Sequence, residues 1–181
     1  MANCINYNCD ELPPYESTIA NCGAKGRNSG ASTMWLLECG ATISDPGNQA
    51  EIDALVLAGL ATELENLKIG FAAPSPITQD SITSCGTPIT INYTRTMSIE
   101  DAKVTTGNTE FWSTAKKRTY GGVILKECST TGLDEVTTFI DAEVSIESYR
   151  DFPNTQDQLQ KYIVTGSWKS YDDPLQYPYT P

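Results

Sequence analysis

The residues from Val136 to Glu147 carry the clearest pattern in this chain, a strict alternation of two kinds of side chain. Because successive side chains of a β-strand point to opposite sides, the pattern predicts one long strand with a mostly apolar face and an acidic, polar face. A strand buried on one side only belongs in an antiparallel sheet. The apolar face holds Val136, Thr138, Ile140, Ala142, Val144 and Ile146, and the polar face holds Thr137, Phe139, Asp141, Glu143, Ser145 and Glu147.

A second alternating segment follows. Residues 151–154, Asp-Phe-Pro-Asn, interrupt the first pattern, and residues 159–168 then place Tyr162, Val164 and Trp168 on one face. The two segments predict a hairpin with a broad loop. Shorter apolar or alternating runs predict further strands over 34–39, 67–71, 89–97 and 123–125.

Two short helices are expected between these strands. Asn48 is a helix-capping residue, Glu51 lies three positions later as in a capping box, and Gly59 is a C-terminal stop. The second helix should begin at Asn108 or Thr109 and end before Gly121. Strands and helices do not alternate regularly, so we expect a mainly β fold, an antiparallel β-sandwich or barrel with one or two short flanking α-helices and extended terminal arms.

The chain divides into three parts by composition. Residues 1–33 are polar and rich in Cys, Asn and Gly, and they predict an N-terminal arm or long loop. Residues 34–170 hold the expected sandwich, and residues 171–181 form a Pro- and Tyr-rich tail that cannot pair as a central strand. Extended arms suit a subunit that contacts neighbours in an assembly, and the alternative is that they are loosely ordered ends. The core is expected to bury together Ile91, Val123, Leu125, Ile140, Val144 and Trp168.

The charge balance argues against direct nucleic-acid binding. The chain has 12 Lys and Arg against 23 Asp and Glu, a formal net charge of −11. Duplex binding relies on basic residues that neutralise phosphates, and the one dense basic run, Lys116-Lys117-Arg118, falls at a predicted helix end, where it offsets the helix dipole. We expect no sequence-specific nucleic-acid binding.

The absence of histidine removes most catalytic designs. Ser/His/Asp and Cys/His nucleophile pairs and His-ligated metal centres all need an imidazole. The close carboxylate pairs fall at a helix start, a turn or the tail, where solvated surface is the simplest interpretation. We therefore expect no enzymatic activity, no cofactor and no metal site.

The cysteines leave three interpretations open. There are six, at positions 4, 9, 22, 39, 85 and 128, and none form a CxxC pair. Reduced, buried thiols are favoured for a protein of the cytosol, with disulfides or a thiolate zinc site in the N-terminal region as alternatives. We expect no membrane span and no export signal, because no apolar run approaches about 18 residues and the N-terminus lacks a basic and then apolar pattern.

The order of the predicted elements resembles one family. The order is a strand, a long loop, a strand, a helix with Phe111-Trp112, a Gly-Gly strand and a long hairpin that closes on residues 167–170, Ser-Trp-Lys-Ser. In this order the chain is similar to the major tail tube proteins of long-tailed bacteriophages. The resemblance spans residues 34–170 and rests on element order, without a diagnostic motif. It implies a structural virion subunit, assembled in the host cytoplasm, that forms homo-oligomeric rings stacked into a DNA conduit and contacts other virion proteins.

Two alternatives remain open at this point. One is a capsid decoration protein or head fibre held by its N-terminal arm. The other is a carbohydrate- or ligand-binding β-sandwich module that uses exposed aromatic side chains such as Trp35, Trp112, Trp168, Tyr177 and Tyr179.

The acidic strand face has an expected position in a tube. A conduit for DNA should not bind phosphate, so a negative inner wall suits it. We therefore predict that Asp141, Glu143 and Glu147 are exposed and face the lumen of the assembled particle.

Overall fold

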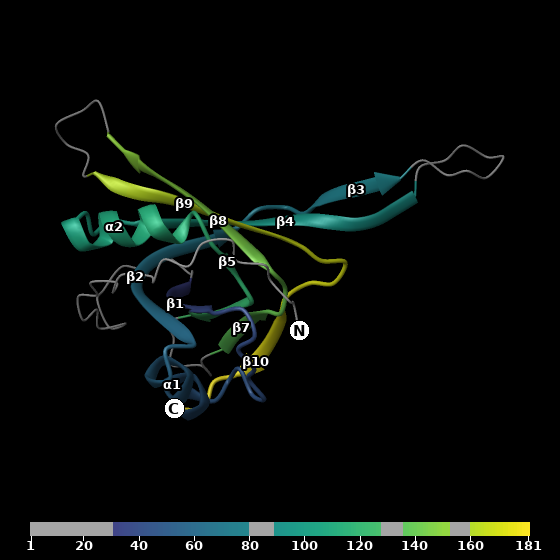
Figure 1. The fold of residues 1–181 in the computed structure, drawn as a ribbon. Helices are drawn as coiled ribbons and strands as arrows, with labels where there is room; N and C mark the ends of the chain where they lie inside the picture. The colour runs from purple at the N-terminus through teal and green to yellow at the C-terminus, as the bar shows by residue number, and fades with distance from the viewer. Residues whose placement is uncertain (1–30, 80–88, 128–135, 153–159) are drawn as a thin grey trace.

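A computed structural model describes residues 31–79, 89–127, 136–152 and 160–181 of the chain (Figure 1). Within these residues, two α-helices, α1 (Gln49–Leu57) and α2 (Thr106–Ala115), accompany ten strands. The strands are β1 (Ala31–Leu37), β2 (Ala61–Phe71), β3 (Ser75–Gln79), β4 (Ile89–Asp101), β5 (Thr119–Tyr120), β6 (Gly122–Glu127), β7 (Val136–Ile140), β8 (Val144–Asp151), β9 (Lys161–Lys169) and β10 (Leu175–Pro178).

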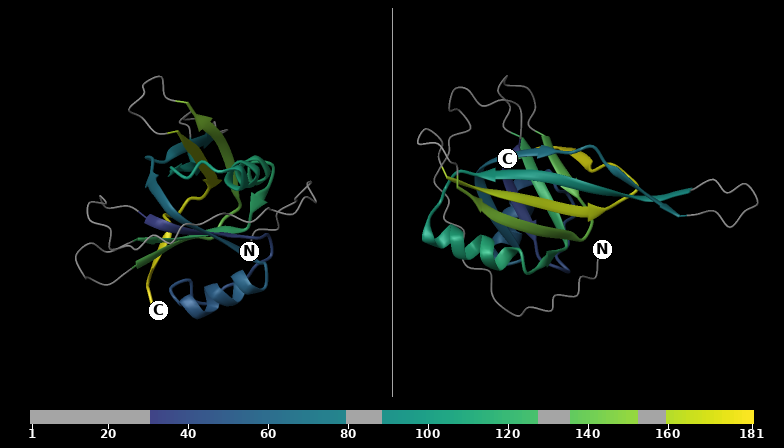
Figure 2. Two further views of the ribbon diagram at one scale, coloured as in Figure 1. Left: turned by 90° about the vertical axis from the view of Figure 1, so that its left-hand side faces the viewer. Right: turned by 90° about the horizontal axis from the view of Figure 1, so that it is seen from above.

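These strands form one antiparallel sheet that is folded over on itself. The order is β10-β7-β6-β1-β2-β4-β9-β8-β5, with β3 paired to β4 beside this path, and the sheet is not closed into a barrel. Folding gives two layers that face each other, one centred on β6 and β1 and the other on β4 and β9 (Figure 2). The expected mainly β, antiparallel fold with two short flanking helices is confirmed.

Strand β2 is where the sheet folds on one side. Residues 61–65 pair with β1 in one layer, residues 67–71 pair with β4 in the other, and Ile69 also pairs with Ala31 at the start of β1. Asn66, between them, has a φ of 65°. This left-handed conformation is uncommon outside glycine but accessible to Asn, and it allows the strand to change layers.

The main core lies between the two layers. It joins Met34, Leu64 and Val123 of one layer to Met97, Val144 and others of the second, and Phe111, Trp112 and Ala115 of α2 close it along one side. Of the six core residues expected from the sequence, Val123, Leu125, Ile140, Val144 and Trp168 are buried together here, whereas the side chain of Ile91 is outside the described part of the structure.

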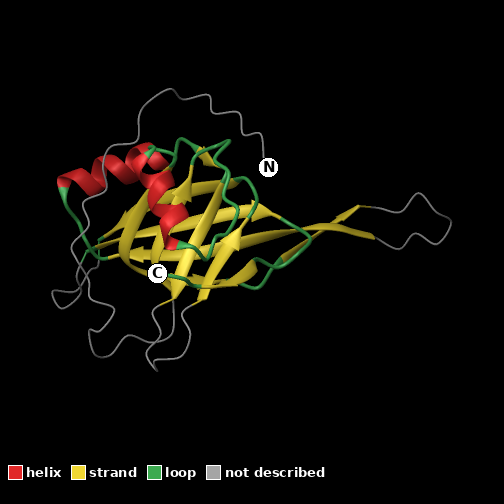
Figure 3. Ribbon diagram, turned by 90° about the horizontal axis from the view of Figure 1, so that it is seen from below, coloured by secondary structure: helices red, strands yellow, loops and turns green. Residues whose placement is uncertain are grey.

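A second core lies on the other face of β1 and β6, beneath α1. It contains Trp35, Leu37, Ile52, Ala61 and Ile124. Figure 3 shows α1 crossing this face of the sheet. Because β1 and β6 are buried on both faces, their sequences read as unbroken apolar runs.

The helix signals are confirmed with one change in each helix. Asn48 caps α1 by accepting a hydrogen bond from the backbone N–H of Ala50, and Gly59 ends it at a φ of 71°. Glu51 does not complete a capping box: its Oε2 accepts from the N–H groups of Ser44 and Asp45 instead. Helix α2 begins earlier than expected, with Thr105 as its cap.

The single long strand predicted over 136–147 is wrong. Strand β7 ends at Ile140 and pairs with β6, and β8 starts at Val144 and pairs with β9, so residues 141–143 cross from one layer to the other. The alternation persists through the crossing because Ile140 and Val144 enter the same core from opposite layers. The hairpin predicted from the second half of the pattern is confirmed as β8 and β9.

Candidate assembly interface

One part of the sheet leaves the body of the protein. We call residues 72–79 and 89–94, which include β3 and the first part of β4, the arm; it projects well beyond both layers (Figures 1 and 3). From Thr94 onward β4 pairs with β9, but in the described structure residues 89–93 have β3 as their one strand neighbour. A two-stranded ribbon is at best marginally stable in water. The arm is therefore an element that gains stability from contact with another surface.

The surface of the arm is apolar and uncharged. Phe71 to Pro76, with the sequence Phe-Ala-Ala-Pro-Ser-Pro, are all exposed, and Ile77 is partly exposed. Phe71, at the foot of the arm, is 49% exposed. Contiguous exposed apolar residues are uncommon on soluble monomers and mark interaction sites when they occur.

The sequence patterns predict strands over 67–71 and 89–97 and none between them, so they do not reveal β3 or this surface. A usable signal was present in the charges: from Ile69 to Thr94 the sequence holds one charged residue, Asp80, although charged residues make up 19% of the chain. A segment of this length with a single charged residue is unexpected for an exposed loop in an acidic protein. Pro74 and Pro76 make β3 hard to recognise from the sequence, because proline is tolerated in an edge strand but interrupts the usual strand pattern.

The base of the arm is fixed by Arg95, which is 9% exposed. Its Nε and Nη2 donate to the carbonyl oxygens of Ser170 and Tyr171, both at 3.2 Å, and its Nη1 forms an ion pair of 2.5 Å with Asp173. The ring of Tyr93 packs near the guanidinium and against Tyr171. This arrangement attaches the start of the C-terminal segment to β4 where the arm leaves the body.

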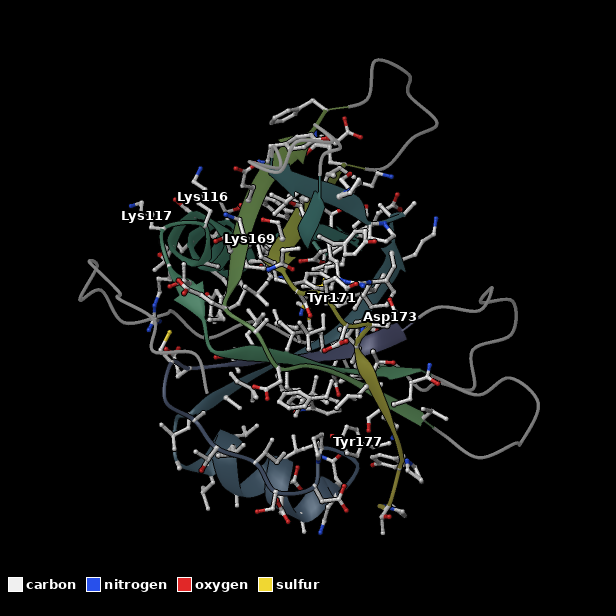
Figure 4. All side chains as sticks on the ribbon, turned by 90° about the vertical axis from the view of Figure 1, so that its right-hand side faces the viewer. Lys116, Lys117, Lys169, Tyr171, Asp173 and Tyr177 are labelled. Atoms are coloured by element: carbon white, nitrogen blue, oxygen red, sulfur yellow. The ribbon has the colours of Figure 1, made fainter. Side chains whose placement is uncertain are left out.

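Residues 170–181, which we call the strap, then cross to the other layer. Figure 4 shows the strap running from Tyr171 and Asp173 down to Tyr177. Strand β10 pairs with the edge of β7, and the chain end reaches α1, where the N–H of Thr180 donates to Gly47 and the N–H of Gln49 donates to Thr180. The tail thus packs on its own chain as an edge strand, and the N-terminal arm expected over 1–33 falls almost wholly outside the described residues.

The three predicted lumen residues are exposed but do not share one strand face. Asp141 and Glu143 lie in the crossing between β7 and β8, and Glu147 lies on the outward face of β8.

The outward face of the layer formed by β4, β9 and β8 is covered by no described helix (Figure 2). Cross-strand pairing places on it Lys68, Lys161 and Lys169 together with Glu100, Glu147 and Asp151, so its formal charges cancel. We call it the open face.

Glu100 sits at the centre of the charges on the open face. Its carboxylate lies 3.0 Å from the Nζ of Lys161 and 3.7 Å from that of Lys68. The hydrogen bond from Lys161, followed by the attraction of both lysines, lowers the pKa of Glu100 below its usual value. The open face therefore combines internally paired charges with hydroxyl side chains such as Thr96, Ser98 and Ser167.

A distinct acidic cluster lies beside α1, on the outer face of the opposite layer. Burial, and then repulsion from Glu65 and Asp53, raise the pKa of Glu63, and the indole of Trp35 and the charge of Lys126 offset part of the rise. Because these carboxylates repel one another, a positive charge placed beside them stabilises their ionised forms.

The basic run after α2 has two roles. Lys116 and Lys117 are exposed at the end of the helix (Figure 4), as expected for dipole compensation. Arg118 turns inward and pairs with Glu38 at 2.7 Å. Burial raises the pKa of Glu38, and Arg118 opposes that rise.

The aromatic residues considered for sugar stacking are largely inaccessible. Trp35 and Trp112 are 1% exposed and Trp168 is 4% exposed. The indole N–H of Trp112 donates to the buried carboxylate of Asp101 at 2.8 Å, which ties α2 to β4. Tyr177 and Tyr179 lie on the strap, where Tyr177 packs against Phe139 and Tyr179 packs against Lys126.

The favoured interpretation of the cysteines is wrong for Cys39, which is disulfide-bonded. The other five cysteines, its partner among them, lie outside the described residues. The Sγ atom of Cys39 is 3.3 Å from the carbonyl oxygen of Thr119.

Among the residues the structure describes, no three His, Cys, Asp or Glu side chains are grouped so as to hold a metal ion. No described helix is long and apolar enough to span a membrane.

No protein-family model, curated protein or solved structure matches the chain.

Proposed function

We propose that this chain is a structural subunit that assembles with copies of itself, and that its place is the tail tube of a long-tailed bacteriophage, where stacked rings of the subunit form a conduit for DNA. The observation that carries self-assembly is the arm. It is a two-stranded ribbon with an exposed apolar surface, and it extends away from the core that stabilises the rest of the sheet.

The charge distribution favours another copy of the chain as the partner. Copies with a formal net charge of −11 repel one another, so they associate most readily through surfaces without charge. The described residues of the arm have no charged side chain. For a positively charged partner, the contact surface of this chain would instead be expected to be acidic.

The tail-tube assignment rests on the resemblance in element order and on the open face. A conduit needs a wall along which DNA moves without being held. The formal charges of the open face cancel, Lys68 and Lys161 are both paired with Glu100, and hydroxyl side chains lie between them, so the face offers phosphates no net attraction. In the proposed ring this face lines the lumen, with Glu147 on it and Asp141 and Glu143 at its margin.

The disulfide of Cys39 is compatible with a virion protein. Disulfides persist in oxidising surroundings, which include the surfaces of released virus particles. A subunit that folds in a host cytoplasm and functions outside the cell experiences both conditions.

The test is the assembly state of the purified full chain. Sedimentation velocity over a wide concentration range, with negative-stain microscopy of the same samples, should show rings that stack into tubes. Isolated trimers would instead support the decoration protein, and a strict monomer at the highest concentration would refute self-assembly.

A second test addresses the conduit in the intact phage. Replacing Asp141, Glu143 and Glu147 with Lys should leave assembly intact and slow DNA delivery, because the new cations contact phosphates. Normal delivery by such particles would argue against a lumenal position for these residues.

A further inference from the structure

We propose that copies of the chain join head to tail, with the arm of one copy docked on the C-terminal end of α1 of the next copy. We call Leu57, Ala58, Gly59 and Leu60 the α1 tip. The inference rests on the self-assembly proposed above and identifies the two surfaces that meet.

The α1 tip is a second apolar surface that the described structure leaves exposed. Leu57 is 91% exposed and Leu60 is 41% exposed, and Ala58 and Gly59 between them are exposed as well. The tip carries no charged residue. An isolated exposed leucine is ordinary, but four consecutive uncharged, exposed residues with two leucines form a patch.

The tip is held in place by the fold. Ile52 anchors α1 in the second core with 0% exposure. The N–H of Leu60 donates to the carbonyl of Leu55 at 2.9 Å, and the carbonyl of Leu60 accepts from the N–H of Glu38 at 2.9 Å. Leu57 and Leu60 are therefore presented on a fixed backbone, which lowers the entropy lost when a partner binds.

The arm and the tip of one molecule do not face each other. In Figure 1 the arm leaves the upper layer toward the right, while α1 lies below the lower layer at the left. The partner of each surface must accordingly come from another molecule. Two different patches on one chain that fit each other give a heterologous contact, which builds a ring when the rotation closes.

Charges around the two patches are complementary. Asp53 precedes the tip by one turn of α1, Glu63 and Glu65 follow it in β2, and the repulsion of Glu65 and Asp53 contributes to the raised pKa of Glu63. Lys169 is exposed at the base of the arm, opposite Thr94, which in turn pairs with Ser75 of β3. A lysine brought by the docked arm relieves the repulsion around the tip, whereas contact between two tips would increase it.

The experiment uses two variants of the full chain at exposed positions. The arm variant is Ala73→Asp with Pro76→Asp, and the tip variant is Leu57→Asp. A chain with Ser113→Asp on α2 and Ser145→Asp on the open face is the control, because it adds the two charges of the arm variant, one more than the tip variant, away from both patches. Circular dichroism verifies that each variant keeps the strand content of the wild type.

Sedimentation velocity and native mass spectrometry of differently mass-labelled variants give the readout. Each variant alone should remain monomeric at concentrations where the wild type and the control assemble, with at least a tenfold weaker association. An equimolar mixture should form a 1:1 heterodimer that does not grow, because it retains one intact arm and one intact tip, on different chains.

The outcomes separate this inference from the proposed function. Assembly of either variant like the wild type would overturn the head-to-tail contact and leave self-assembly standing. A mixture that stays monomeric would show that the arm and the tip do not meet each other. A wild type that never assembles would refute both proposals.

Discussion

Glu63 is the residue whose protonation most directly reports on the crowded charges near α1. Its folded pKa lies above the ordinary value of 4.5, so the folded state disfavours its ionised form. Replacing Glu63 with Gln should raise the free energy of unfolding at pH 7. Below the unfolded pKa the carboxyl is protonated in both states, so the gain should vanish as the pH falls through the folded pKa to below about 4. Urea unfolding at a series of pH values measures this.

Glu100→Gln is the matched control for that measurement, because the pKa of Glu100 is shifted in the opposite direction. Its loss should remove a stabilising charge that is present above the ordinary carboxyl pKa and is lost as the pH falls through the folded value. A stability gain from Glu100→Gln, or no pH dependence for Glu63→Gln, would contradict this account of the two faces.

At the level of elements, the strap depends on a close approach at Gly47. A Cβ atom there would overlap the carbonyl oxygen of Pro178, which belongs to the backbone and cannot rotate away. Gly47→Ala should therefore displace the end of the strap and cost about 1–3 kcal/mol of stability, the usual range for overpacking. Hydrogen exchange should show faster exchange at the amides of Gln49 and Thr180, whose bonds join the strap to α1.

Gly70→Ala is the control for Gly47→Ala, because a Cβ atom at Gly70 meets nothing within 4 Å. It should keep or slightly raise stability, since glycine in a strand carries an entropic cost of about 0.5–1 kcal/mol. Unchanged exchange at Gln49 in Gly47→Ala would mean that the strap tolerates displacement.

Local patterns predicted most elements, and they failed where the chain changes layers. The cap at Asn48 and the stop at Gly59 are set by neighbouring residues, and the sequence shows them directly. The break between Ile140 and Val144 is invisible in the alternation, because the main core receives both side chains. Strand β2 was recognised from Leu67 onward. Its first part buries Ala61 in the second core and Leu64 in the main core, on opposite faces of the strand, so its sequence shows no alternation.

The candidate interface could be predicted only in part. The acidic residues are exposed, but their separation into the crossing and the open face depends on which strands pair. Among the described residues, 89–93 pair with no strand other than β3, and this is what makes the arm; partner strands are a long-range property that local sequence does not show. The uncharged sequence from Ile69 to Thr94 was the local sign of it.

For the whole molecule, the disulfide of Cys39 links the loop after β1 to a cysteine outside the described residues. Reduction should lower the free energy of unfolding by about 2–4 kcal/mol, mainly by enlarging the unfolded ensemble. Thermal unfolding with and without reductant measures the change, and a chelator serves as the control. A loss caused by chelator alone would instead reveal a structural metal bound through cysteines outside the described residues.

The way β4 enters the body also determines how the arm responds to force. From Thr94 to Asp101 this strand is hydrogen-bonded to β9, and from Met97 to Asp101 it is bonded to β2 on its other side. The bonds lie perpendicular to the strand, so tension along the arm shears them together instead of opening them one at a time. Arg95 adds side-chain bonds to the strap at the point where the load enters. A chain of subunits held through such arms would resist stretching while its two-stranded ribbons still bend.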